Sequence, residues 1–292
     1  FDNYFAAKRR LFEGLGTPPP ELAVINVDDP WGVKLLDIPN PRRMTFGINA
    51  AADVRPTQFT QNHTGLHATL VTPAGRLEIE SPLAGRANLA NILAATATAI
   101  GLEVPMGKIQ EGIALLAAVP GRFERIDEGQ PFVVVVDYAH TDDALRNVLK
   151  TARELTRERL IVLFGCGGDR DRTKRPLMGE AAGSLADIVV LTSDNPRRED
   201  PLLILNDALV GLQKTGTPYT AEVDRETAIR KSLETAREGD VVVLAGKGHE
   251  TYQILKDRTI PFDDREVARR LLREMGYRAE DAASLRAKPN RH

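Results

Sequence analysis

Four polar segments of the sequence carry side chains that bind charged groups, and two of them, 165–175 and 246–250, also contain glycines; the other two are residues 137–140 and 193–197. The segment 165–175 is the richest, with three glycines and four basic side chains. Glycines let backbone N–H groups approach an anion, and arginines bind carboxylates or phosphates through paired hydrogen bonds. The segment therefore predicts an anion-binding loop, although a solvated turn with surface arginines would have the same composition.

The segment 194–197 offers a further group for a carboxylate ligand. Pro196 restricts the backbone, and Arg197 carries five N–H donors that suit a carboxylate. Taken alone, the segment is more commonly a turn and a helix N-cap that precede Pro201, but its place at the same edge as the arginine-rich loop favours a binding function.

Residues 246–250 look like a phosphate-binding loop but lack its pattern. There is no glycine at position 241 and no Ser or Thr after Lys247, and no second histidine stands four residues from His249. These absences exclude both a P-loop and a two-histidine metal motif. We expect instead a glycine-rich turn with His249 and Glu250 at the start of a helix, where Glu250 either binds a ligand or serves as a first-turn acid.

Three further residues allow both a functional and a structural interpretation. Asp137 ends an apolar strand, where a carboxylate often binds ribose hydroxyls, or it caps the helix beginning near Asp142. Lys8 lies on an apolar helix and is by default a surface lysine. Cys166, the single cysteine, has no evident activating partner and is interpreted as a packing residue.

The second half of the chain has the periodicity that would bring the polar segments together. Apolar runs predict strands at 132–136, 160–164, 188–191 and 241–245, and helical patterns lie between them at 144–154, 177–185, 204–212 and 227–236. Buried strands alternating with helices are typical of a mainly parallel, Rossmann-like α/β sheet covered on both faces. Ligands bind at the carboxyl ends of such strands, and each polar segment follows one of them.

The first half mixes short strands, turns and helices. We expect a helix over 5–12, a strand over 22–27, a hairpin of 67–71 with 77–80, and an Ala-rich helix over 88–100 closed by Gly101. The length of 292 residues suggests two domains, and the change of pattern divides them into 1–120 and 121–292.

Composition limits the class of protein. The 39 basic and 41 acidic residues nearly cancel, which gives no support for a nucleic-acid partner. One cysteine excludes an internal disulfide framework, and no apolar run is long enough for a membrane helix. The chain starts without Met or signal-peptide features, so we expect it to be part of a longer cytoplasmic protein.

Several strings, taken together and in order, resemble the Mur ligases, and among them the branch that adds meso-diaminopimelate. The strings are residues 4–8, 120–124, 135–145, 164–171, 194–197 and 245–251. The resemblance extends from Phe1 to about Tyr277. It implies the latter part of a central, ATPase-type domain over 1–120, followed by a complete Rossmann-like C-terminal domain over 121–292.

The resemblance implies an ATP- and Mg²⁺-dependent amide ligase of peptidoglycan precursor synthesis. Its substrates would be UDP-N-acetylmuramoyl-L-alanyl-D-glutamate and meso-diaminopimelate, joined through an acyl phosphate by a cytoplasmic, monomeric enzyme with no nucleic-acid or membrane partner. The family's phosphate loop and first domain have no counterpart in this sequence, so we expect the chain to be inactive by itself.

Site residues carry over by similarity. Lys8 matches a lysine that CO₂ carbamylates, which makes it a Mg²⁺ ligand. The residues that match ATP contacts are Asn88, Asn91, Arg122 and Asp137. The residues that match the meso-diaminopimelate pocket are Arg170, Asp194, Asn195, Pro196, Arg197, Gly246 and Glu250.

Two other classes of function stay open. A lysine-adding Mur ligase or a folylpolyglutamate synthetase would share the fold, but Arg197 together with Asp194 and Asn195 argues against both. Lysine in particular lacks the carboxylate that Arg197 would bind. The third possibility is an amino-acid-binding module without catalysis.

Overall fold

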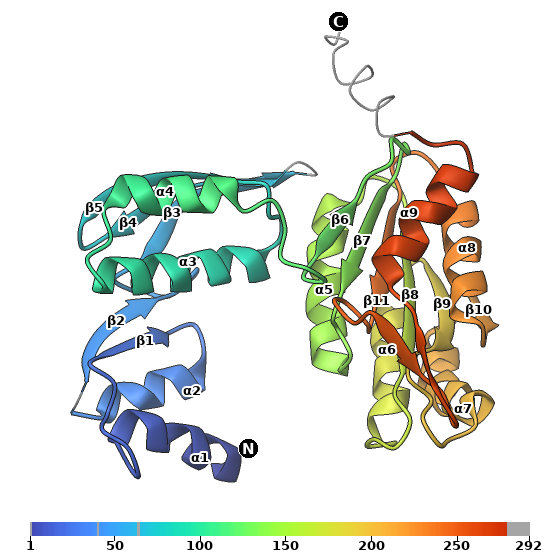
Figure 1. Cartoon of the computed structure of the whole chain (residues 1–292), viewed down its shortest axis with the longest axis horizontal. Helices are drawn as coiled ribbons and strands as arrows, with labels where there is room; N and C mark the ends of the chain where they lie inside the picture. The colour runs from blue at the N-terminus through green and yellow to red at the C-terminus, as the bar shows by residue number, and fades with distance from the viewer. Residues whose placement is uncertain (1, 40, 63–64, 279–292) are drawn as a thin grey trace, which may run out of the picture. The chain divides into compact units, whose positions relative to one another are not determined.

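The computed structural model describes residues 2–39, 41–62 and 65–278. The chain folds into two compact units, Phe1–Ala117 and Ala118–His292 (Figure 1). Phe1, where the first expected domain begins, and the C-terminal segment 279–292 lie outside the described residues. Among the described helices, none combines the length and apolar character needed to cross a membrane.

The first unit contains two small sheets and several helices. Strands β1 and β2 pair in parallel, and β3, β4 and β5 form an antiparallel sheet. The element bounds are α1 Asp2–Glu13, β1 Leu22–Asn26, α2 Pro30–Val33, the 3₁₀ turn η1 Lys34–Asp37, β2 Arg42–Phe46, β3 Arg55–Asn62, β4 Gly65–Thr72, β5 Gly75–Ser81, α3 Arg86–Gly101 and α4 Met106–Leu115.

Sequence patterns located part of this unit. The helix over 5–12, the strand over 22–27, the hairpin and the Ala-rich helix all exist, with ends shifted by a few residues. Strand β3 was not predicted, because its sequence is largely polar and shows no alternation of apolar residues. In the structure the strand is partly exposed. Gly101 does not close its helix, because it is the last helical residue and Leu102 follows it as the cap.

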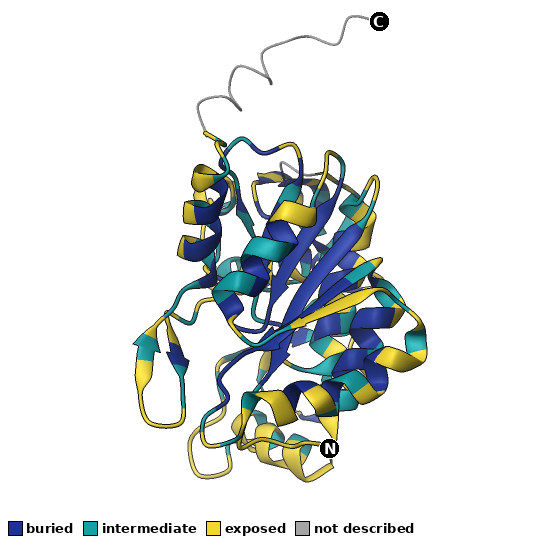
Figure 2. Ribbon diagram, turned by 90° about the vertical axis from the view of Figure 1, so that its right-hand side faces the viewer, coloured by how far each residue is buried: buried dark blue, intermediate teal, exposed yellow. Residues whose placement is uncertain are grey.

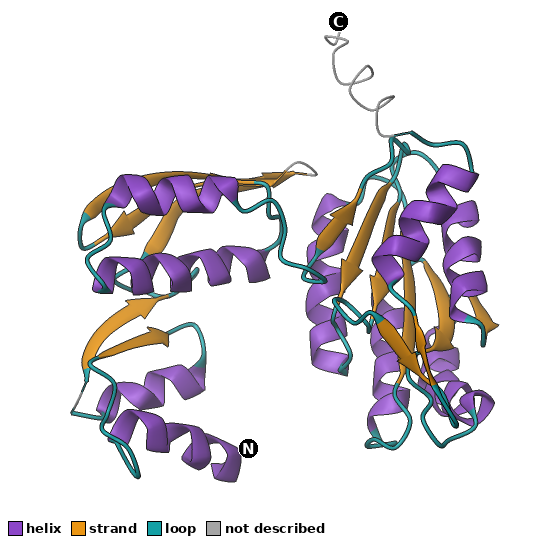
Figure 3. Ribbon diagram, viewed as in Figure 1, coloured by secondary structure: helices purple, strands orange, loops and turns teal. Residues whose placement is uncertain are grey.

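The second unit is built on a six-stranded sheet with the order β10-β9-β8-β11-β7-β6. Strand β6 runs antiparallel to β7, and the other neighbours are parallel. Figure 3 shows the helices flanking the strands of this unit. The bounds are β6 Glu124–Ile126, β7 Val133–Asp137, α5 Asp142–Leu155, β8 Leu160–Cys166, α6 Lys174–Leu185, β9 Ile188–Ser193, α7 Pro201–Leu212, the 3₁₀ turn η2 Gln213–Thr215, β10 Tyr219–Glu222, α8 Arg225–Thr235, β11 Val241–Ala245, β12 Tyr252–Ile254, β13 Thr259–Pro261 and α9 Asp264–Glu274.

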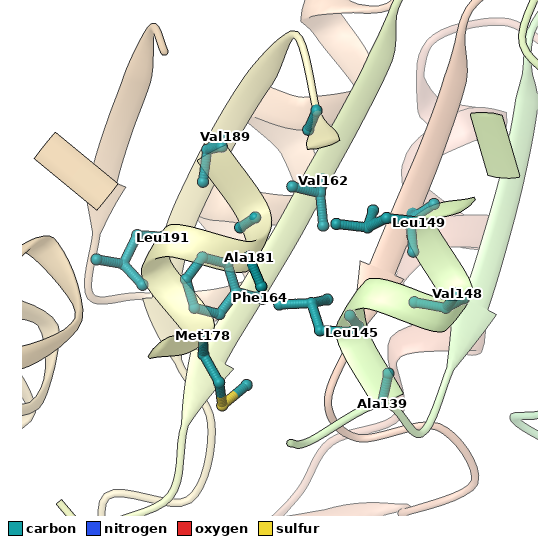
Figure 4. Packing of buried hydrophobic residues seen from close by; sticks show 14 of the residues in the cluster. Ala139, Leu145, Val148, Leu149, Val162, Phe164, Met178, Ala181, Val189 and Leu191 are labelled. Carbon is teal, nitrogen blue, oxygen red and sulfur yellow. The ribbon is translucent and has the colours of Figure 1, made fainter. Parts of the chain in front are cut away.

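Two hydrophobic clusters cover the two faces of this sheet. Alternate residues of β8 point to opposite faces, so Val162 and Phe164 belong to one cluster and Ile161 and Leu163 to the other. The first cluster includes side chains of α5, α6 and α7, and Figure 4 shows Leu145, Phe164 and Met178 converging between strand and helices. The second includes side chains of α8 and α9. Strands β8 and β11 are accordingly buried along their length, and Figure 2 shows the buried strands of this sheet.

The mainly parallel α/β sheet is confirmed. The four strands and four helices predicted for it all form, and the helices begin two or three residues earlier than expected. Strand β10 and helix α9 were missed, because β10 is a short, largely exposed edge strand and α9 is dominated by charged residues. The strand order places the segments after β9, β8, β11 and β7 side by side at one edge of the sheet.

Candidate ligand-binding site

The polar segments at this edge enclose a cavity of about 490 Å³. Six of the seven residues predicted to bind the amino acid line it: Arg170, Asp194, Asn195, Arg197, Gly246 and Glu250. The seventh, Pro196, is buried and does not line it. Tyr138, His140, Lys174 and Tyr252 complete much of the polar wall.

Asp194 places a carboxylate in the wall of this cavity. The residue is 6% exposed, and in the described part of the chain its side-chain oxygens accept no hydrogen bond. Its nearest ion-pair partner is Lys247, with 3.9 Å between Nζ and Oδ1. Burial raises the pKa of Asp194, while the nearby Arg225 and Lys247 cations lower it. A buried carboxylate in this position is stabilised by a cationic ligand.

Asn195 and Glu250 are held in fixed orientations next to Asp194. The Asn195 Nδ2 donates to Glu250 Oε2 at 2.9 Å, and Asn195 Oδ1 accepts from the backbone N–H of Ile254 at 2.9 Å. Lys247 Nζ donates to Asn195 Oδ1 at 3.3 Å and to Glu250 Oε2 at 3.2 Å. One oxygen of Glu250 is therefore engaged, whereas Oε1 accepts no hydrogen bond within the described residues.

The helix expected at residues 249–250 is wrong. Residues 246–250 form a turn closed by the Glu250 N–H donating to the Lys247 carbonyl, and the hairpin β12–β13 follows. The Ile254 N–H donates to Asn195 Oδ1, and the Ile254 carbonyl accepts from the Arg197 N–H, so β12 is tied to residues 195–197. Glu250 is therefore no first-turn acid, and the hairpin places Tyr252 at the cavity.

Below the cavity, Arg225 and Asp264 form an ion pair with no solvent exposure. Arg225 donates from Nε and Nη2 to the Asp264 carboxylate at 2.8 and 2.6 Å. The guanidinium also donates to the carbonyls of Ser193 and Ala245, at the ends of β9 and β11. These two residues were missed, since nothing near them in the sequence indicates that α8 and α9 meet here.

Arginine cations also line the cavity. Arg197 has a left-handed backbone, with φ of 53°, and its Nη1 donates to the Gly168 carbonyl at 2.9 Å. Its Nε and Nη2 have no acceptor among the described residues, so they are available to a ligand. Arg170 is exposed and lines the same cavity. The N-cap alternative for 194–197 is wrong, because Asp200 caps α7.

Arg175 joins the two loops that carry these cations. It is buried and donates to Glu199 at 2.8 and 2.9 Å, to Asp207 at 2.9 Å and to the Gly167 carbonyl at 3.2 Å. Its hydrogen bonds lower the pKa of Glu199 to about 2. The sequence placed Arg175 in a ligand-binding loop, but the structure gives it a scaffolding position.

Cys166 lines the cavity but is buried, and burial raises its pKa to about 12. Its Sγ lies 3.7 Å from the Met178 sulfur within the hydrophobic cluster. The packing interpretation is therefore confirmed, because a protonated, buried thiol is a poor nucleophile.

Asp137 and Arg122, which match ATP contacts, are close to one another but do not line the cavity. The Asp137 carboxylate accepts from the backbone N–H groups of Phe123 and Ala139 at 2.8 and 2.9 Å. Burial raises the pKa of Asp137. The exposed Arg122 guanidinium lies 5.1 Å from the Tyr138 ring. The helix-cap alternative for Asp137 is wrong, because Thr141 caps α5.

The remaining predicted residues belong to the first unit. Lys8 is exposed on α1, with its Nζ 5.4 Å from the Tyr4 ring. Asn88 is buried and donates to the Ala84 carbonyl at 2.8 Å, whereas Asn91 is exposed on the same helix. Within the described residues, no three His, Cys, Asp or Glu side chains stand together in a way that could hold a metal ion.

The second unit is thus a mainly parallel α/β domain with a cavity that is lined by both acidic and basic side chains. The chain matches two family models, the Mur ligase middle domain over residues 1–99 and the Mur ligase glutamate ligase domain over residues 121–248. The chain belongs to the Mur ligase family.

Curated relatives share this assignment over 94% of the chain. A UDP-N-acetylmuramoyl-L-alanyl-D-glutamate–2,6-diaminopimelate ligase of Solibacter usitatus (strain Ellin6076) is 58% identical over 276 residues. One of the same name from Geobacillus thermodenitrificans (strain NG80-2) is 47% identical over 277 residues. The chain spans 56% and 57% of these two relatives, respectively.

Solved structures agree with the fold. A structure of a UDP-N-acetylmuramoyl-L-alanyl-D-glutamate–2,6-diaminopimelate ligase is 37% identical, with a TM-score of 0.63 over 94% of this chain and 57% of that one. A UDP-N-acetylmuramate–alanine ligase from Thermotoga maritima is 21% identical, with a TM-score of 0.64 over 94% of this chain and 56% of that one. The second likeness supports the fold alone.

Proposed function

We propose that this chain carries the amino-acid-binding part of an ATP-dependent ligase that adds meso-diaminopimelate to UDP-N-acetylmuramoyl-L-alanyl-D-glutamate. The observation that carries the proposal is the cavity at the carboxyl edge of the sheet, which is lined by both the buried Asp194 carboxylate and Arg197. The names of the relatives at 58% and 47% identity agree with it.

The cavity suits one end of meso-diaminopimelate. Each end of this amino acid carries an ammonium and a carboxylate group. In the proposal Asp194 and Glu250 receive the ammonium, and Arg197 and Arg170 receive the carboxylate. L-Lysine has an ammonium but no carboxylate at its far end, so it would leave the arginine donors unpaired, which costs binding energy in a buried site.

The contribution of this chain to catalysis is then the positioning of the nucleophile. With one end held, the amine of the other end attacks the activated D-glutamate carboxylate, so that an amide forms and phosphate leaves. Holding the amine in a fixed orientation lowers the entropic part of the barrier. When bound, ATP would supply the phosphoryl group that activates the carboxylate.

The ATP and metal contacts stay predictions from the resemblance. Arg122 and Asp137 would bind phosphate and ribose, Asn88 and Asn91 the adenine, and carbamylated Lys8 a Mg²⁺ ion. The described residues assemble no metal site, so no step is assigned to Mg²⁺. We place the reaction in peptidoglycan precursor synthesis in the cytoplasm, carried out by a monomer.

Amino-acid-dependent phosphate release tests the proposal. The product of the full reading frame is assayed with ATP, Mg²⁺ and UDP-N-acetylmuramoyl-L-alanyl-D-glutamate, and meso-diaminopimelate is compared with L-lysine. We expect release with diaminopimelate alone, and none from the 292-residue chain assayed in parallel. Release with lysine instead would contradict the assignment of Arg197, and binding of diaminopimelate without any release would favour a non-catalytic binding module.

A further inference from the structure

Lys247 is a cation with no solvent exposure at the floor of the cavity. A buried ammonium is costly unless charged or polar groups compensate it, so its surroundings show what it does there. Its Nζ lies 3.2 Å from Glu250 Oε2 and 3.3 Å from Asn195 Oδ1, and 3.9 Å from Asp194 Oδ1. All three partners line the cavity, whereas Lys247 does not. Lys247 therefore acts on a bound ligand indirectly, through Glu250, Asn195 and Asp194.

The charges around Lys247 do not cancel. Asp194 from the β9 loop and Glu250 from its own loop face it, and the Tyr252 ring lies 5.8 Å away. Arg225 from α8 and Asp264 from α9 are also near Asp194. Arg225 and Asp264 neutralise one another in a direct pair. Lys247 then faces two carboxylates, Asp194 and Glu250, so one negative charge stays uncompensated at the cavity wall.

We propose that Lys247 is a positioning and charge-setting residue of this cavity. Its ammonium holds Glu250 and Asn195 in place. It also offsets one of the two negative charges of Asp194 and Glu250, so that the cavity wall keeps one net negative charge and favours a ligand end with a single ammonium group. This inference rests on the proposed function, because it assumes that an amino acid enters here.

Without Lys247, the carboxylates of Asp194 and Glu250 would lose the cation that both of them now contact. Like charges at this distance disfavour double ionisation, so one carboxyl would retain a proton that a ligand ammonium has to displace. Binding of the ligand would then release a proton and weaken as the pH falls. With Lys247 in place, its ammonium lowers the pKa of Asp194, so we expect affinity to depend less on pH than it does without Lys247.

The test compares the 292-residue chain with its Lys247→Met variant. The first measurement uses no ligand: carboxyl-¹³C NMR follows the titration of Asp194, and we expect its pKa to be higher in the variant. The control is Lys256→Met, which removes the same charge from the exposed turn between β12 and β13 and should leave the titration unchanged. An unaltered Asp194 titration in Lys247→Met overturns the proposal.

The second measurement is calorimetric titration with meso-diaminopimelate in buffers of different ionisation enthalpy. We expect affinity of the variant to fall by roughly tenfold or more near pH 6, with release of up to about one proton per ligand bound. Weaker binding with the same proton count and pH profile as the unaltered chain would indicate a purely structural role and overturn the proposal. Absence of binding by the unaltered chain would contradict the proposed function, and the Asp194 titration would still decide the role of Lys247.

A fold-preserving alternative covers the case in which Lys247→Met does not fold. The double variant Lys247→Met/Glu250→Gln removes one charge of each sign and is compared with Glu250→Gln alone. A higher Asp194 pKa in the double variant supports the proposal, and equal values overturn it.

Discussion

At the residue scale, Arg197 distinguishes the two candidate amino acids. Its left-handed backbone and its hydrogen bond to the Gly168 carbonyl direct the guanidinium along the cavity wall, while Nε and Nη2 stay available. A carboxylate ligand would form charge-assisted hydrogen bonds with these donors, which are stronger than neutral ones.

We expect Arg197→Ala to lose at least about 2 kcal/mol of meso-diaminopimelate binding, as for a severed charged hydrogen bond. L-Lysine binding should change little, so the preference between the two ligands should shrink. Calorimetric titration measures both affinities. Arg198→Ala is the matched control, because Arg198 is exposed and pairs with Asp169 on the surface. An unchanged affinity for diaminopimelate in Arg197→Ala would refute the assignment.

At the scale of elements, the site depends on the loops after β8 and β9 lying against one another. The Gly168 N–H donates to the Asn195 carbonyl at 2.9 Å, and Arg175 bridges Gly167 to Glu199 and Asp207. These contacts join the segment that carries Arg170 to the segment that carries Arg197.

The Glu199–Arg175 pair should make stability depend on pH. Arg175 lowers the pKa of Glu199 from 4.5 to about 2, so the pair stabilises the fold above about pH 4.5 and this contribution is lost as the pH falls toward 2. We expect Glu199→Gln to lower the free energy of unfolding at neutral pH, and the difference from the unaltered chain to shrink on acidification. Urea unfolding across pH measures it, with Glu234→Gln on an exposed position of α8 as the control. A difference that is constant with pH would contradict the ion pair.

The close approach of the two loops also requires a glycine at position 168. A Cβ there would lie 1.9 Å from the Pro196 carbonyl oxygen. We expect Gly168→Ala to cost roughly 1–3 kcal/mol of stability through overpacking and to weaken ligand binding. In the control Gly107→Ala, the new Cβ meets no atom within 4 Å. Thermal unfolding and calorimetric titration compare the two, and a fully tolerated Gly168→Ala would show that the loops are not held as described.

At the scale of the whole molecule, the second unit contains everything that builds the cavity. Both hydrophobic clusters and all the cavity-lining residues lie within 118–278. We therefore expect a fragment 118–278 to unfold cooperatively and to bind meso-diaminopimelate as tightly as the 292-residue chain does. Chemical denaturation and calorimetric titration of the two proteins measure this. A fragment that is unfolded, or that binds much more weakly, would show that residues 1–117 contribute to the site.

Much of the second unit could be predicted from the sequence, because its signals are local. Runs such as Val241–Ala245 are apolar at successive positions, which indicates a strand buried on both faces, and the polar segment after each strand follows directly in the sequence. The positions of Asp194, Arg197 and Glu250 at one edge followed from this pattern and from the resemblance to the Mur ligases. The turn at 246–250 could not be predicted as a hairpin start, since its conformation depends on the distant Asn195.

The sequence by itself determined the class of fold, the edge of the sheet at which ligands bind and most of the residues in the cavity wall. The tertiary structure alone decided which charges compensate one another. Arg225 meets Asp264 at a separation of 39 residues, and Lys247 meets Asn195 at a separation of 52. Whether a charge is buried or exposed depends on which segments pack around it, and periodicity along the chain carries no information about partners so far away.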